Sequence, residues 1–109
     1  MTDFDADKLR EYRNVLGATA LVRLWNDFVF DTEKIFASVN LLNRDEQRLK
    51  FHNLRAGALV FGLQAFSVAC ASLEKAITDG IDIEALAEEL QEAKMLFIRQ
   101  RAKVDDFLE

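Results

Sequence analysis

The chain has 109 residues and a mass of 12.5 kDa, enough for one domain with a buried core but too short for an added kinase or ATPase domain. Half of the residues are hydrophobic and 30% are charged, as in ordinary globular proteins. Proline is absent and glycine occurs four times, which argues against an all-β fold and its many tight turns. We therefore treat residues 1–109 as a single domain.

The net charge is −5 and the isoelectric point is near 4.9, which argues against sequence-independent nucleic-acid binding. No apolar run approaches the roughly 18–20 residues of a membrane span, and the acidic N-terminus is unlike a signal peptide. The single cysteine, Cys70, cannot form an internal disulfide. Cys70 and His52 alone are too few ligands for a metal site without carboxylates or a second chain. We expect a cytoplasmic protein with no cofactor or metal of its own.

The first half of the chain has the periodicity of two helices. A short helix is expected to begin at one of three N-cap candidates, Asp3, Asp5 or Asp7, and to be interrupted at Gly17. Its apolar face comprises Leu9, Tyr12 and Leu16. The following helix carries an apolar stripe over about six turns, formed by Leu21, Leu24, Trp25, Phe28, Ile35, Phe36, Val39 and Leu42.

A third helix is predicted from Asn43 to about Phe61, because Asn43 and Glu46 have the spacing of a capping box. Gly62 is expected to end or bend it. A fourth helix should stop at Asp79–Gly80, a favourable left-handed end. The apolar row of this fourth helix consists of Leu63, Phe66, Cys70, Leu73 and Ile77.

Asp82 can cap a last long helix. Its apolar face consists of Leu86, Leu90, Ala93, Phe97, Val104 and Leu108. Four substantial helices with short connections predict an all-α, up-down antiparallel four-helix bundle, with the short extra N-terminal helix lying across one end.

The only histidine, His52, is predicted to point to solvent. On a helical wheel its opposite side carries Leu54, Ala58 and Phe61, the expected core face. Beside the histidine lie two cationic and three apolar residues, namely Arg48, Leu49, Arg55, Ala56 and Leu59. Leu63 and Val60 are nearby, and the segment 44–55 has a local charge of +2, from four cations and two carboxylates. Exposed apolar surface of this kind, formed by Leu49, Leu59 and Leu63, suits docking to an acidic partner.

An ordinary interpretation of the same residues stays open at this point. A single histidine on a helix is most often only a solvated side chain, and the leucines would be core residues if the helix were rotated. Cys70 and the regularly spaced aromatic residues are expected in the core. The carboxylates on the last helix are interpreted as a solvated face formed by Glu84, Glu88, Glu89 and Glu92.

Segment 52–63, HNLRAGALVFGL, resembles the signature of histidine-containing phosphotransfer (HPt) domains, roughly H-x-L-K-G, small residues, an apolar residue and glycine. The matching positions are His52, Leu54, Gly57, Ala58, Phe61 and Gly62. Leu73–Glu74 also resembles a recurrent Leu-Glu pair of that family. Arg55 stands where lysine is usual, which keeps the positive charge, and Ala56 replaces a glycine, which adds a methyl group beside the imidazole.

The resemblance implies a stand-alone bacterial phosphorelay carrier of two-component signal transduction. His52 would accept a phosphoryl group from an aspartate of one receiver domain and pass it to another, with Arg55, Ala56 and Gly57 around it. Arg55 and Arg48 would stabilise phosphate charge, and Gln64 would be a hydrogen-bonding neighbour. The partners implied are receiver domains of response regulators and hybrid histidine kinases, which would hold the Mg²⁺.

Two alternatives remain beside the carrier. A pure interaction module would keep the receiver-docking face and exchange no phosphate. An enzyme is disfavoured because no second catalytic group can be assigned, and the absence of a glycine-rich phosphate loop predicts no ATP-dependent kinase site. A histidine-kinase dimerisation domain normally has Glu or Asp after its histidine, whereas Asn53 follows His52.

Overall fold

The computed structural model describes residues 4–109, and these form helices joined by short turns. The all-α prediction is confirmed for this part of the chain. The α-helices are α1 (Ala6–Leu16), α2 (Ala18–Ser38), α3 (Arg44–Val60), α4 (Gln64–Thr78) and α5 (Ala87–Leu108). Two short 3₁₀ helices, η1 (Val39–Leu41) and η2 (Ile83–Leu86), lie in the connections. None of the helices formed by residues 4–109 is both long and apolar enough to cross a membrane.

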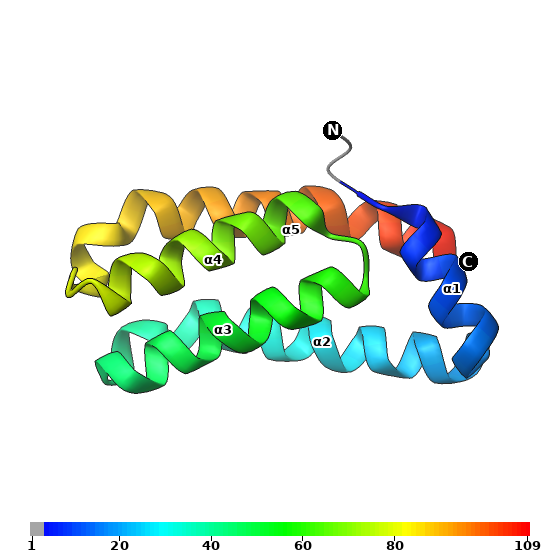
Figure 1. Ribbon diagram of the computed structural model, residues 1–109, viewed down its shortest axis with the longest axis horizontal. Coiled ribbons are helices and arrows are strands. Elements are labelled where there is room, and N and C mark those ends of the chain that lie inside the picture. The colour runs from blue at the N-terminus through cyan, green and yellow to red at the C-terminus, as the bar shows by residue number, and fades with distance from the viewer. Residues whose placement is uncertain (1–3) are drawn as a thin grey trace.

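The long helices α2 to α5 lie along the longest dimension of a body measuring 41 × 26 × 18 Å (Figure 1). Helices α3 and α4 form one layer, and α2 and α5 pass behind them, while α1 lies at the end where α5 finishes (Figure 1). The α2–α5 contact is fixed by polar bonds between side chains distant in sequence: Trp25 Nε1 donates to Asp105 Oδ1 at 2.8 Å, and Arg101 donates to Glu33 at 2.7 Å.

Most of the predicted helix ends are confirmed. Asp5 is the N-cap of α1, its carboxylate accepting from the backbone N–H of Asp7 at 3.1 Å; of the other two candidates, Asp7 lies inside the helix and Asp3 lies outside the described residues. Gly17 separates α1 from α2, and Asn43 and Glu46 form both bonds of the capping box. The side chains of Asp5, Asn43 and Glu46 satisfy backbone donors that a helix start leaves free, whereas Gly17 makes no side-chain cap bond.

Asp82 does not cap α5 as predicted. Its carboxylate accepts a hydrogen bond from Arg44 Nη2 at 2.6 Å, and no side-chain cap bond forms. The chain first makes the 3₁₀ turn η2 and becomes α-helical only at Ala87. The Asp82 carboxylate, which the local sequence predicts to cap the helix, is therefore used in a long-range ion pair with Arg44.

The core contains the predicted apolar rows of the third, fourth and fifth helices, with Leu90 and Leu108 partly buried. Two residues placed on apolar faces by the sequence are exposed: Leu16 by 43% and Leu24 by 46%. Val29, which the predicted stripe omitted, is buried instead. The apolar stripe of α2 was drawn too wide, because Leu24 lies about 100° from the inward-facing Trp25 on the helix.

A short N-terminal strap, Phe4 and Asp5, closes over the turn between α3 and α4. The Asp5 N–H donates to the Gly62 carbonyl at 2.7 Å, and Phe4 forms an isolated antiparallel bridge with Leu63. Gly62 has φ +74°, and a Cβ atom there would lie 2.2 Å from the Asp5 carbonyl oxygen. Glycine is thus required at this turn both by backbone conformation and by the close approach of the strap.

Gly62→Ala should lower the free energy of unfolding by more than about 3 kcal/mol, because it combines left-handed backbone strain with a steric clash. Gly17→Ala is the matched control, since Gly17 has φ +87° but nothing within 4 Å of its added Cβ. It should cost about 1–3 kcal/mol. Urea melts of both variants measure the difference, and equal losses would contradict a specific role for the strap contact.

Candidate functional site

His52 lies in the middle of α3, on the side of the helix that faces away from the core. Its neighbours Phe51 and Leu54 are buried, whereas 48% of the His52 side chain is exposed. The predicted rotation of the helix is therefore confirmed. The side chain lies on an open surface: a cleft of about 450 Å³ between α2 and α3 is lined by Lys50 and Asn53 but not by His52.

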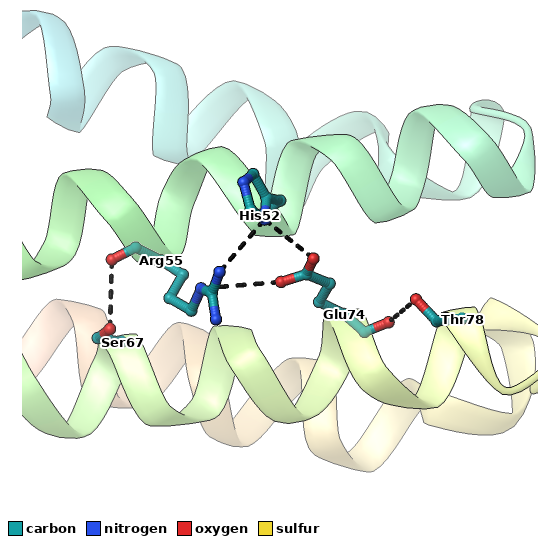
Figure 2. A network of polar contacts seen from close by, with 5 residues as sticks. All are labelled: His52, Arg55, Ser67, Glu74 and Thr78. Atoms are coloured by element: carbon teal, nitrogen blue, oxygen red, sulfur yellow. Dashed lines mark hydrogen bonds and ion pairs between the residues drawn. The ribbon is translucent and has the colours of Figure 1, made fainter.

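The imidazole is held by a carboxylate from the adjacent helix. His52 Nδ1 lies 3.0 Å from Oε2 of Glu74, which projects from α4 (Figure 2). The Glu74 side chain is only 18% exposed, so this carboxylate is largely shielded from water by the helices and the imidazole. A hydrogen bond to a charged acceptor is stronger than one between neutral groups, and partial burial strengthens it further.

Arg55 completes a three-residue cluster (Figure 2). Its Nη2 lies 3.3 Å from His52 Nδ1, and its Nε lies 3.8 Å from Glu74 Oε1. The guanidinium and the imidazole sit one turn apart on α3, and both face the same carboxylate. The charge of Glu74 is thus shared between a permanent cation and the histidine ring.

The contacts of Nδ1 determine which nitrogen carries the hydrogen. A carboxylate oxygen and an unprotonated ring nitrogen are both acceptors, and at 3.0 Å they would repel each other. Nδ1 must therefore carry the hydrogen and donate it to Glu74, which means that it does not accept from Arg55. In the neutral imidazole the lone pair is then on Nε2, the nitrogen for which the structure gives no partner within residues 4–109.

Two side chain–backbone bonds lie beside this cluster, one between α3 and α4 and one within α4. The Ser67 hydroxyl donates to the Arg55 carbonyl at 3.2 Å, which joins the two helices directly. The Thr78 hydroxyl donates to the Glu74 carbonyl at 2.8 Å within α4 (Figure 2). His52 lies three residues before Arg55 on α3, and Glu74 lies seven residues after Ser67 on α4, about 4.5 and 10.5 Å along the two helices. The long Glu74 side chain therefore reaches back about one helical turn to meet the imidazole.

The apolar surface predicted beside His52 is present in part. Leu49 and Leu59 are 49% and 50% exposed, Ala56 is exposed, and Arg48 is half-buried one turn before the histidine. Leu63 was placed on the same surface, and this is wrong: it is fully buried. The helix ends at Val60, so the wheel used for residue 63 no longer applies beyond the turn.

Two more predicted neighbours of the imidazole lie elsewhere. Gly57 faces α2, where a Cβ atom would lie 2.5 Å from Cε1 of Phe28, so it permits close helix packing rather than access to His52. Gln64 is the first residue of α4, at the turn, whereas the imidazole contacts Glu74, which lies ten residues, about 15 Å, further along that helix.

Glu74 is the site residue that sequence reasoning missed as a functional group. It was noted only within a Leu-Glu pair resembling the HPt family. Its contact with His52 spans 22 residues, so no local pattern could reveal it. Cys70, by contrast, is fully buried as predicted, and burial raises the pKa of its thiol to about 12.

No protein-family model, curated protein or solved structure matches this chain. Among residues 4–109, no three His, Cys, Asp or Glu side chains gather as metal ligands would.

Glu74→Gln should shift the tautomer of the neutral imidazole, so that less of the hydrogen is on Nδ1 and more on Nε2. The neutral amide is a weaker acceptor than the carboxylate that lies 3.0 Å from Nδ1, so it favours the Nδ1–H tautomer less strongly. Nitrogen-15 NMR of the imidazole ring measures the tautomer. The parent protein should carry the hydrogen predominantly on Nδ1, and the variant should show a clear shift toward Nε2–H. Predominant Nε2–H in the parent protein would contradict the assignment.

Proposed function

We propose that this protein is a histidine phosphotransfer protein of a two-component phosphorelay. His52 accepts a phosphoryl group from the aspartyl phosphate of one receiver domain and passes it to the aspartate of another. The observation that carries the proposal is the 3.0 Å contact of Nδ1 with Glu74, which directs an unprotonated Nε2 away from the helix. This geometry adds to the resemblance of segment 52–63 to the HPt signature.

The transfer step uses this orientation directly. The Nε2 lone pair attacks phosphorus, the nitrogen–phosphorus bond forms, and the bond from phosphorus to the aspartate oxygen breaks to release a carboxylate. The ring gains positive charge because Nδ1 keeps its hydrogen, and the Glu74 carboxylate stabilises that charge. The reverse sequence, with a second receiver aspartate as nucleophile, discharges the ring.

The cations beside the imidazole support an incoming phosphoryl group. Arg55 lies within 3.3 Å of the ring, and Arg48 is one helical turn before it on the same face. Phosphoryl transfer depends on alignment and charge stabilisation more than on covalent chemistry by the protein. The receiver would supply the Mg²⁺ and the acidic pocket, and this chain would supply a rigid helix bearing the nucleophile.

The arrangement of the helices is consistent with the proposed role. Four long helices side by side, with α3 and α4 antiparallel, support an up-down antiparallel four-helix bundle with α1 across one end (Figure 1). A rigid bundle would hold His52 on a convex surface suited to another domain rather than to a small substrate. The carrier would act in the cytoplasm and would have no ATP site of its own.

A receiver-binding module that carries no phosphate is the second candidate. The exposed Leu49 and Leu59 favour it, because they would support docking whether or not transfer occurs. The two functions differ in one observable, the appearance of acid-labile, alkali-stable phosphate on this chain.

His52→Gln should abolish phosphate uptake from a phosphorylated receiver domain and retain the helical fold. Glu74→Gln should still accept phosphate, but about tenfold to a hundredfold more slowly, because it loses a charged hydrogen bond. Radiolabel transfer measures both rates, and circular dichroism checks the fold. Labelling that survives in His52→Gln would refute the assignment, and an unphosphorylated parent protein that still binds the receiver would favour the docking module.

Leu59→Glu should weaken receiver binding by about thirtyfold while changing the free energy of unfolding by only about 0.5 kcal/mol. The carboxylate would enter a desolvated contact opposite an acidic partner. Ile98→Glu on α5 is the matched control, since Ile98 is 52% exposed and lines a groove between α2 and α5, whereas His52 lies against α4. Calorimetry and urea melts test both variants, and equal binding by the two would place the receiver contact elsewhere.

A further inference from the structure

A second surface of the chain has chemistry complementary to the face around His52. A groove of about 200 Å³ runs between α4 and α5. Its α4 side is formed largely by small residues, Ala69, Ser72 and Ala76, which leave room for an approaching side chain. On α5, Glu89 and Glu92 form its rim, both are exposed, and neither has an ion-pair partner within residues 4–109.

Leucine and alanine residues have the same spacing along the α3 face and along the α5 side of the groove. Along α3, Leu49 and Leu59 are ten residues apart, with a small residue, Ala56, seven after the first leucine. Along η2 and α5, Leu86 and Leu96 have the same separation, with Ala93 at the equivalent position; Leu86 and Ala93 are buried at the floor of the groove, and Leu96 is half-buried. In helical geometry ten residues span about 15 Å, so the two rows are of equal length.

The residues between the leucines have opposite chemistry. Three and six residues after Leu49 come His52 and Arg55, with Arg48 beside them. Three and six residues after Leu86 come Glu89 and Glu92. Glu74 already balances the charge of Arg55 and the imidazole is neutral, so the cation that this face offers to a partner is Arg48. Arg48 and the exposed leucines match an apolar groove with two carboxylates at its edge, and such charge complementarity favours association in one register.

We propose that the α4–α5 groove binds the α3 face of a second copy of this chain. The two surfaces are different parts of the molecule, so the contact is head-to-tail and gives rings where the rotation between copies closes and open chains where it does not. His52 lies within the contacting face, so association would cover its imidazole. That consequence for phosphate transfer rests on the proposed function, whereas the association itself does not.

Sedimentation velocity of the full chain at low ionic strength tests the proposal. The average mass should rise with protein concentration and return toward the monomer in high salt, because exposed charges are then screened. Arg48→Glu, which alters the face, and Glu92→Lys, which alters the groove, should each weaken association by about tenfold. Their controls, Lys8→Glu and Glu11→Lys on α1, make the same charge changes on exposed sites outside both surfaces and should leave the average mass unchanged.

The most decisive measurement uses an equimolar mixture of Arg48→Glu and Glu92→Lys. Each variant alone places like charges on its face and its groove, so its copies repel one another. In the mixture, the acidic face of Arg48→Glu meets the basic groove of Glu92→Lys, and the basic face of Glu92→Lys meets the acidic groove of Arg48→Glu. Association should therefore return. A monomer at every concentration would overturn the proposal, as would an unaltered mass for Glu92→Lys, which would indicate that α3 pairs with itself. Circular dichroism confirms that the variants are folded, and none of these outcomes depends on phosphate transfer.

Discussion

The antiparallel alignment of α3 and α4 is the constraint on which the site depends. The Ser67–Arg55 bond, the turn at Gly62 and the strap at Asp5 all act on this pair of helices. Because the helices are rigid, fixing the turn and one point along the interface fixes the level of every later residue. Glu74 thereby meets His52 at 3.0 Å, and a ring that would otherwise rotate freely on an exposed helix acquires one orientation and one tautomer.

Local rules predicted the helices well because their signals are local. The capping box at Asn43 and the glycine after α1 act within a few residues, and the wheel placed His52 on the exposed side because α3 is regular from Arg44 to Val60. Failures occurred where regularity ended or a distant group intervened. Leu63 lies beyond the last turn of α3, and Asp82 is taken by Arg44, 38 residues earlier.

The position of the candidate site on the third helix could be predicted from the sequence, but the orientation of its imidazole could not. The sequence indicates an exposed histidine with cations and leucines beside it, but the partner that orients the ring comes from another helix. Gly57 illustrates the reverse error, since a small residue near the histidine in sequence serves the contact with Phe28 on α2. Residues adjacent along a helix face different neighbours every 100°, so closeness in sequence does not establish a shared site.

We propose that Glu74 leaves Nε2 as the reacting nitrogen of His52. Nitrogen-15 and phosphorus-31 NMR of the protein, after transfer from a phosphorylated receiver domain, locates the phosphoryl group on the ring. We expect a bond from phosphorus to Nε2, with Nδ1–H still hydrogen-bonded to Glu74. Phosphate on Nδ1, or no phosphate on the ring at all, would contradict it.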